Sequence, residues 1–251
     1  MRIDLNSDLG ESFGAWKMGM DAEVLPSVTS ANVACGWHGG DPLVMEKTVD
    51  LALKNGVAIG AHPSFPDLLG FGRRNMSVSH PELKAYVKYQ IGALWAFVKA
   101  KGASLQHVKA HGAMYNQAAT DYFFAMALAE AIREVDDKLI FVGLSGSRMI
   151  QAGLDAGIQV RSEVFADRTY QDDGTLTPRN LPGAVIHDAG TVIGRVIRLV
   201  KEGKIESING KDIGIRADTI CVHGDNPEAV VLARSIRAAL EREGIEVKAL
   251  R

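Results

Sequence analysis

Ionisable and polar residues recur just after short apolar segments along this chain. The first such segment runs into Asp4-Leu-Asn-Ser-Asp-Leu-Gly-Glu, and later ones end at His62 and at Lys109-Ala-His. Carboxylates, imidazoles and an amine are the groups that general acid–base catalysis and charge stabilisation require. No single pair among them is diagnostic, but the repetition from segment to segment predicts one shared site.

These candidates share faces of the segments that carry them. Asp4, Asn6 and Asp8 lie on one face by period-two alternation, as do Lys109 and His111. Charged side chains are rarely buried without a partner or a purpose, so such a face indicates a polar site. In chain order the candidates are Asn6, Asp8, Glu11, Asn32, His38, His62, Arg73, Lys109, His111, Tyr115, Asn116, Glu163, Asp167, Arg168, His223 and Asp225.

Each candidate also has a structural interpretation, which stays open at this point. Asp8 could accept backbone N–H groups of the turn at Gly10, and Lys109 with His111 could form a structural salt bridge. A thiolate near a histidine would be an activated nucleophile. No local signature supports that chemistry here, so Cys35 and Cys221 are interpreted as packing residues. Three further histidines are expected to serve local structure only: His80, His107 and His187.

Short strand-like segments alternate with longer helical patterns, and these elements must position the candidates. Apolar runs predict strands at 2–5, within 24–34, and at 57–61, 107–110, 139–144, 158–164 and 219–222. Capping signals and helical spacing predict helices at 42–54, 80–101, 118–135, 147–156, 187–202 and 226–243. A small hairpin insertion is expected at 205–216, and a polar excursion at 171–182.

This alternation of strands and helices predicts an α/β fold. Strands separated by helices of this length run parallel and are joined by right-handed crossovers. Seven such units favour an incomplete seven-stranded parallel (β/α) barrel in one domain, residues 1–251, with an open doubly wound sheet as the competing topology. The carboxyl ends of barrel strands meet at one face, where active sites lie, so we expect the candidates to converge there.

Composition excludes several classes of protein. The 251 residues include 28 Lys+Arg and 30 Asp+Glu, and 47% are hydrophobic, which is typical of a globular chain. The net charge of −2 gives no electrostatic footprint for nucleic acid or an anionic membrane. No apolar run approaches the roughly 20 residues of a membrane span, and the start lacks the apolar core of a signal peptide. With two cysteines, too few for a disulfide framework, we expect a cytoplasmic protein.

The chain closely resembles the LamB/YcsF family in six segments that follow one another in order. They are Asp4-Leu-Asn-Ser-Asp-Leu-Gly-Glu-Ser-Phe-Gly, Ser30-Ala-Asn-Val-Ala-Cys-Gly-Trp-His-Gly-Gly-Asp, Gly60-Ala-His-Pro-Ser-Phe-Pro-Asp, Val108-Lys-Ala-His-Gly-Ala-Met-Tyr-Asn, Glu163-Val-Phe-Ala-Asp-Arg-Thr-Tyr and Cys221-Val-His-Gly-Asp. The resemblance covers nearly the whole chain. It implies a seven-stranded barrel similar to the glycoside hydrolase and polysaccharide deacetylase barrels.

The resemblance also implies a function. Members of this family would open the lactam of 5-oxo-L-proline to L-glutamate while hydrolysing ATP, together with two further subunits, B and C. The chain shows no phosphate loop or dinucleotide fingerprint of its own, which agrees with ATP being shared with those subunits.

Roles in such a reaction can be assigned as a hypothesis. Asp8 would be the general base, with His38 or His62 orienting it or the attacking water. Lys109 would stabilise phosphate or oxyanion charge, and His111 would donate a proton to the leaving group. The remaining candidates would bind and position the substrate: Asn6, Glu11, Asn32, Arg73, Tyr115, Asn116, Glu163, Asp167, Arg168, His223 and Asp225.

Whether a divalent metal takes part stays open. Asp8, His38, His62 and His223 could supply oxygen and nitrogen ligands for zinc or a similar ion, although no tight His-x-x-x-His pair is present. Two rival functions follow. One is a stand-alone, metal-dependent amide or sugar deacetylase that needs no ATP. The other is a non-catalytic subunit that only binds and presents the substrate.

Overall fold

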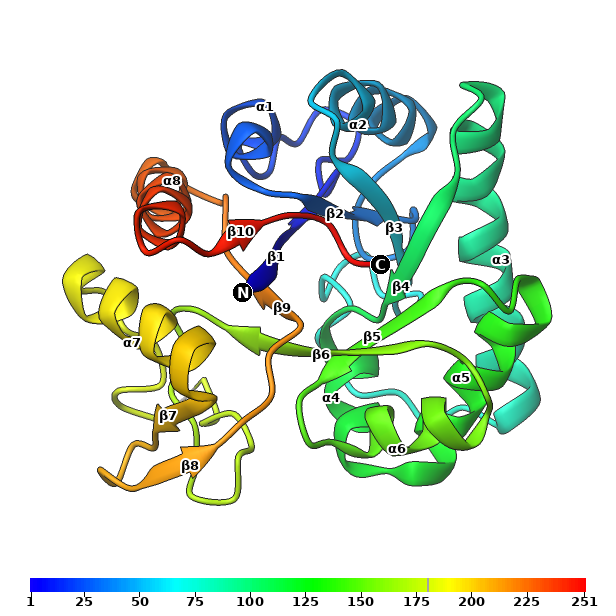
Figure 1. Ribbon diagram of the computed structural model, residues 1–251. Coiled ribbons are helices and arrows are strands. Elements are labelled where there is room, and N and C mark those ends of the chain that lie inside the picture. Colours follow the sequence, from blue (N-terminus) through cyan, green and yellow to red (C-terminus); the bar gives the residue numbers. More distant parts are fainter. Residues whose placement is uncertain (180) are drawn as a thin grey trace.

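A closed ring of parallel strands forms the centre of the computed structural model, which describes residues 1–179 and 181–251 (Figure 1). The ring runs in the order β1-β2-β3-β4-β5-β6-β9, and β9 pairs with β1 to close it. Its strands are β1 (Arg2–Leu9), β2 (Ser30–Ala34), β3 (Ala58–His62), β4 (Leu105–Lys109), β5 (Ile140–Leu144), β6 (Val160–Phe165) and β9 (Thr219–Cys221). The predicted seven-stranded parallel barrel is confirmed.

Helices surround the ring and cover its outer face (Figure 1). They are α1 (Asp21–Val24), the 3-10 turn η1 (Leu25–Ser27), α2 (Pro42–Lys54), α3 (His80–Ala100), α4 (Gly112–Thr120), α5 (Tyr122–Val135), α6 (Arg148–Asp155), α7 (Ala189–Glu202) and α8 (Pro227–Arg242). The predicted caps are present: Asp41 accepts hydrogen bonds from two N–H groups of α2, and Ser79 with Glu82 forms a capping box on α3. No helix in the described ranges combines the length and apolar character of a membrane span.

Alternation along the strands separates an apolar layer from a polar barrel interior. Ile3, Leu5 and Val33 are buried in the hydrophobic core between strands and helices. Asp4 and Asn6, the intervening residues of β1, are also buried, yet they hydrogen-bond to side chains of other ring strands. The interior of this barrel is therefore a polar network rather than the layers of branched apolar side chains that usually fill a closed parallel barrel.

The strand predicted within 24–34 is confirmed as Ser30–Ala34. The residues just before it form η1, which suits Pro26 because this residue has no N–H to donate to a central ladder. One predicted element differs from the structure. The predicted helix 118–135 is two helices, α4 and α5. Asp121 interrupts them with extended backbone and caps α5 by accepting from the Phe124 N–H.

The C-terminal residues close the amino-terminal end of the barrel. A short strand that the sequence did not predict, β10 (Glu246–Val247), pairs with the first residues of β1. Beyond it, Leu250 packs against Ile140 and Val142, and its carbonyl accepts a 3.0 Å hydrogen bond from Gln106. The ring is thus covered at this end and accessible at the other.

The two insertions can be compared with their predictions. The hairpin expected at 205–216 is confirmed as β7 (Lys204–Glu206) and β8 (Asp212–Gly214), which pair antiparallel. The excursion expected at 171–182 contains residue 180, which lies outside the described residues. Around that gap it consists of turns, with one bridge from Tyr170 to Leu176.

Candidate active site

A column of hydrogen-bonded polar side chains runs through the barrel interior. At its base Asp4 accepts hydrogen bonds from the hydroxyls of Ser30, at 2.6 Å, and Thr219. Asn6 donates to Thr219 at 2.7 Å and accepts from Asn32 at 2.8 Å. Burial raises the pKa of Asp4. These buried groups satisfy one another across three strands, which fixes the orientation of each.

The column connects His107 to Asp8 through Asn32. The His107 Nε2 donates to the Asn32 side-chain oxygen at 2.8 Å, and the Asn32 amide donates to Asp8 Oδ1 at 2.8 Å. Burial, together with Lys109, lowers the pKa of His107 to about 3, so the ring is neutral. Gly60 makes room for this ring, because a Cβ there would lie 2.1 Å from His107 Nε2. His107 therefore positions Asn32, and Asn32 positions Asp8.

Lys109 is a buried cation held by two carboxylates. Its Nζ lies 2.7 Å from Glu163 Oε1, 3.0 Å from Asp8 Oδ1 and 3.2 Å from the Asn6 oxygen. Burial alone would lower the pKa of Lys109, but the neighbouring acidic groups, Asp8 first, outweigh it and raise the pKa well above its ordinary value. Tyr115 donates to the other Glu163 oxygen at 2.6 Å. The three hydrogens of the ammonium are donated to Asp8, to Asn6 and, at 3.4 Å, to Cys221 Sγ, while Glu163 neutralises the charge as an ion pair.

Asp8 is the ionised carboxylate at the upper end of this column. Its Oδ2 lies 3.3 Å from His62 Nε2. Burial favours the protonated acid, but His62 and Lys109 outweigh it and hold the pKa of Asp8 well below its ordinary value. The side chain is 26% exposed, so it can reach solvent or a ligand. An ionised carboxylate that is partly exposed to the hollow is suited to accept a proton from a bound water.

Two histidines beside Asp8 have their tautomers set by backbone carbonyls. His62 Nδ1 lies 2.7 Å from the Lys109 carbonyl, and His111 Nε2 lies 2.9 Å from the Phe71 carbonyl. A carbonyl only accepts, so both nitrogens carry the hydrogen. The remaining nitrogens, His62 Nε2 and His111 Nδ1, face each other at 3.0 Å, with the rings nearly perpendicular. Burial and the adjacent histidines lower the pKa of His111 well below its ordinary value.

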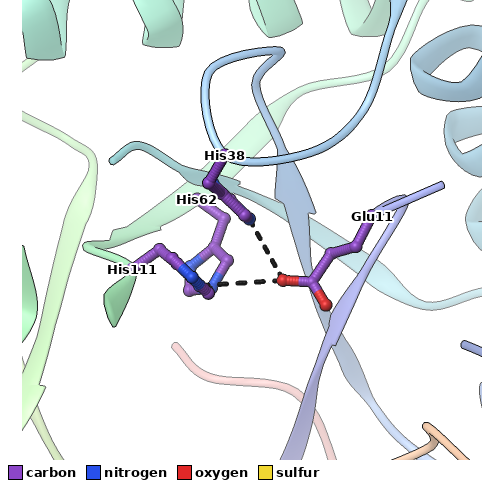
Figure 2. A group of neighbouring side chains, drawn as sticks. All are labelled: Glu11, His38, His62 and His111. Carbon is purple, nitrogen blue, oxygen red and sulfur yellow. Dashed lines mark hydrogen bonds and ion pairs between the residues drawn. The ribbon is translucent and has the colours of Figure 1, made fainter. Parts of the chain in front are cut away.

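Glu11 and His38 complete this group (Figure 2). Glu11 Oε1 lies 3.1 Å from His38 Nε2 and 3.6 Å from His111 Nδ1. The rings of His38 and His111 stack in parallel with centroids 3.7 Å apart. Burial raises the pKa of Glu11, while burial and His62 lower that of His38. The four potential ligand atoms of Glu11, His38, His62 and His111 lie within 4.8 Å of one another, so these residues could hold a metal ion.

A hollow of about 2200 Å³ opens above these groups. It is larger than the 300–1,000 Å³ of a typical small-molecule site. Most of the sequence-predicted residues line it: Asp8, Glu11, His62, Arg73, Lys109, His111, Tyr115, Asn116, Asp167, Arg168, His223 and Asp225. Four others lie behind this lining and contact protein groups instead: Asn6, Asn32, His38 and Glu163.

The wall of the hollow carries a further imidazole–carboxylate pair. His223 Nδ1 lies 2.8 Å from Asp167 Oδ2. Burial alone would lower the pKa of His223, but the bond to Asp167 outweighs it and raises the pKa. Arg168 is buried and donates to the carbonyls of Thr177 and Ala184, at 2.5 and 3.2 Å, so its guanidinium holds the neighbouring segment in place. Arg73 is exposed, with its guanidinium over the Phe71 ring.

A family model identifies the group of proteins to which this chain is related. The model of the LamB/YcsF family matches residues 3–251. The chain belongs to the LamB/YcsF family. The resemblance drawn from the six sequence segments is thereby confirmed.

Relatives of this LamB/YcsF chain match it along nearly its full length. The chain is similar to the 5-oxoprolinase A subunit of Alkaliphilus metalliredigens, with 60% identity over 98% of this chain and 96% of the relative. It is 59% identical to the protein of the same name from Campylobacter jejuni, over 99% of this chain and 98% of that one. A solved structure, the lactam utilization protein from Thermus thermophilus, is 48% identical, covers all of both chains and superposes with a TM-score of 0.96.

The geometry changes part of the metal hypothesis for this LamB/YcsF chain. Of the four residues suggested as ligands, His38 and His62 lie in the group that could hold an ion. His223 is paired with Asp167 instead, and Asp8 contacts the group through His62. Glu11 and His111 complete the group, and neither was suggested as a ligand from the sequence.

Two site residues of the LamB/YcsF chain were missed or undervalued. His107 was expected only to begin a strand, and Asp4 was noted without a role. Period-two alternation with Lys109 on β4 points His107 inward and was the available signal. The packing interpretation of the cysteines agrees with the structure, since both are buried and burial raises the pKa of Cys35 to about 12.

Proposed function

We propose that this chain is the A subunit of an ATP-dependent 5-oxoprolinase, which opens the lactam of 5-oxo-L-proline to L-glutamate while ATP is hydrolysed to ADP and phosphate. It would act together with two partner subunits, B and C. The names and close similarity of its relatives support this assignment. The structural observation that carries it is the ionised Asp8, held by Lys109 and Asn32 at the floor of a large hollow.

Opening a five-membered lactam has three chemical requirements. The amide is stabilised by resonance, so water must be deprotonated as it attacks, the oxygen must carry charge, and the departing nitrogen must receive a proton. Phosphorylation of the lactam oxygen by ATP meets the second requirement, because phosphate then carries the charge. The residues of this chain would meet the other two.

The proposed sequence of steps is balanced as follows. The γ-phosphoryl group of ATP passes to the lactam oxygen, and ADP leaves. Water adds to the same carbon while Asp8 takes one of its protons, and Asp8 returns that proton to the ring nitrogen as the C–N bond breaks. The remaining hydroxyl proton leaves as the carbonyl forms and passes to the released amine, which becomes an ammonium group. The resulting acyl phosphate reacts with a second water to give the glutamate side-chain carboxylate and inorganic phosphate.

The contacts refine the roles predicted from the sequence. Lys109 donates hydrogen bonds to Asp8, Asn6 and Cys221 and forms an ion pair with Glu163, so we assign it the task of keeping Asp8 charged and oriented. His111 donates through Nε2 to the Phe71 carbonyl, which leaves no free hydrogen for a leaving group. Proton delivery to the nitrogen is therefore assigned to Asp8.

The size and charge of the hollow fit two ligands better than one. Its volume of about 2200 Å³ exceeds what a small lactam needs, which leaves room for the phosphates of ATP or for a segment of a partner subunit. Among the cationic groups on the lining, Arg73 and His223 could bind the substrate carboxylate. We propose that ATP is bound jointly with the partners.

The test is glutamate release from 5-oxoproline and ATP by the co-purified complex of all three subunits from one organism. Asp8→Asn should lower turnover by at least about 100-fold, because the proton carrier is lost. Asp50→Asn, an exposed carboxylate on α2 paired with Lys101, is the matched control and should leave turnover unchanged. Full activity of the Asp8→Asn complex would refute the proposal.

The same preparations distinguish the rival functions. Release of acetate from an acetylated sugar by this chain alone, without ATP, would favour a stand-alone deacetylase. A non-catalytic subunit would show a different pattern: substitutions in the hollow would raise KM and leave kcat unchanged.

A further inference from the structure

Three potential ligand atoms meet beside Asp8, and a positive charge, either a proton or a metal ion, has to lie among them. His62 and His111 each donate through one ring nitrogen to a backbone carbonyl, at 2.7 and 2.9 Å. When both rings are neutral, their other nitrogens, 3.0 Å apart, are both acceptors. Glu11 Oε1, a third acceptor, lies 3.6 Å from His111 Nδ1. Buried acceptors facing one another repel unless a positive charge lies between them.

We infer that this group binds a divalent transition-metal ion of the zinc type, with His62 Nε2, His111 Nδ1 and Glu11 Oε1 as ligands. Two imidazoles and one carboxylate are an established ligand set for catalytic zinc. With metal–ligand distances of 2.0–2.1 Å, ligand atoms around a tetrahedral ion lie about 3.4 Å apart. The separations of 3.0 and 3.6 Å bracket that value.

His38 would support the ligand Glu11 rather than bind the ion. Its ring is parallel to that of His111, with 2° between the planes, so the lone pairs of the two rings cannot point at one ion. Its Nε2 lies 3.1 Å from Glu11 Oε1, which suits donation to the carboxylate. Ligating carboxylates and histidines are usually held by such outer hydrogen bonds.

The loop behind His111 is built with backbone strain that this arrangement explains. Phe71 has a φ of 54°, the one positive value among non-glycine residues in the described ranges, and its carbonyl orients His111. The next residue, Gly72, lets the chain pass close to two imidazoles, because a Cβ there would lie 2.9 Å from His38 Cβ and 3.0 Å from His111 Cδ2. The strain thus positions a ligand.

An ion here would lie next to the proton carrier. Asp8 Oδ2 is 3.3 Å from His62 Nε2, and Asp8, Glu11, His62 and His111 all line the hollow. A three-ligand site leaves a position free for a water or a substrate oxygen. This use of the ion in turnover rests on the proposed function, but the binding of the ion does not.

The experiment measures zinc binding by the full-length chain, free of any histidine tag, without ATP, 5-oxoproline or partner subunits. After dialysis against a chelator and its removal, zinc chloride is titrated calorimetrically. Wild type should bind one ion per chain, and His111→Gln should bind at least about 100-fold more weakly. His223→Asn, which removes an imidazole from the same hollow but outside the ligand group, is the matched control and should bind like wild type.

Two further variants keep the inference testable if His111→Gln fails to fold, as judged by circular dichroism. Glu11→Gln removes a ligand outside the strands and should also lose zinc. His38→Gln should weaken binding by about 10–100-fold, as expected for an outer partner. Absence of zinc binding by wild type would overturn the inference, as would equal binding by wild type and Glu11→Gln. Because no substrate is present, failure of the oxoprolinase assay would leave this result unaffected.

Discussion

Replacing Lys109 with Met should destabilise the fold far more than the loss of a surface charge would. The ammonium is 3% exposed and lies between Asp8 and Glu163, and the Glu163 side chain is fully buried. Removing one member of a buried ion pair leaves an uncompensated charge and costs about 3–5 kcal/mol. At about 2–4 °C per kcal/mol for a chain of this size, the midpoint of thermal unfolding should fall by roughly 6–20 °C.

A double-mutant cycle tests that reasoning. Urea unfolding of wild type, Lys109→Met, Glu163→Gln and the double variant gives four free energies of unfolding. Once Lys109 is absent, the buried Glu163 charge is itself unfavourable, so neutralising it should recover part of the loss. The two effects should therefore differ from additivity by at least about 1 kcal/mol. Strict additivity, or a loss below about 1 kcal/mol for Lys109→Met, would show that the ion pair does not hold the column together.

Three further changes have expected outcomes. Leu250→Ala should lower the free energy of unfolding by about 2–5 kcal/mol in urea titrations, because it uncovers the amino-terminal end of the barrel. Gly60→Ala should cost about 1–3 kcal/mol in the same titration, since its Cβ would overlap the His107 ring. Asp167 raises the pKa of His223, so their attraction is fully present below about pH 6.5 and fades as pH rises through the folded-state pKa. Asp167→Asn should therefore lower the unfolding temperature more in mildly acidic than in alkaline buffer.

Matched controls exist for the first two of these changes. Leu69 is 96% exposed, so Leu69→Ala should stay within about 0.5 kcal/mol of wild type. Gly194 lies in α7 with open space around its Cβ position, and Gly194→Ala should be neutral or stabilising. Equal losses in a buried variant and its control would contradict the packing described for that position. For the third change, a Tm difference independent of pH would contradict the assigned pair.

The sequence predicted the barrel and the convergence of the site because both depend on local periodicity. Alternation on β1 places Asp4, Asn6 and Asp8 on one face, and parallel topology brings the strand ends together. The same alternation places Lys109 and His111 on one face, and both line the hollow. These inferences need only spacing along the chain and the handedness of crossovers.

Other features depend on contacts that spacing does not encode. The helix breaks at Asp121 because its side chain caps α5 instead of letting the helix continue. The apolar pattern runs on both sides of Asp121, so the sequence pattern alone predicts one continuous helix. The grouping of Glu11 with His111 depends on two loops after different strands, and the tautomer of His111 depends on the strained carbonyl of Phe71. Such details arise from tertiary packing. The sequence therefore predicted that Glu11 and His111 belong to the site, but not that they lie together as potential metal ligands.

The most direct test of the central claim is a crystal structure of the reconstituted complex with 5-oxoproline bound. The lactam should lie in the hollow of this chain, with its ring carbon one water molecule away from Asp8 and its carboxylate near Arg73 or His223. A lactam bound wholly within one of the partners, away from Asp8, would contradict the account.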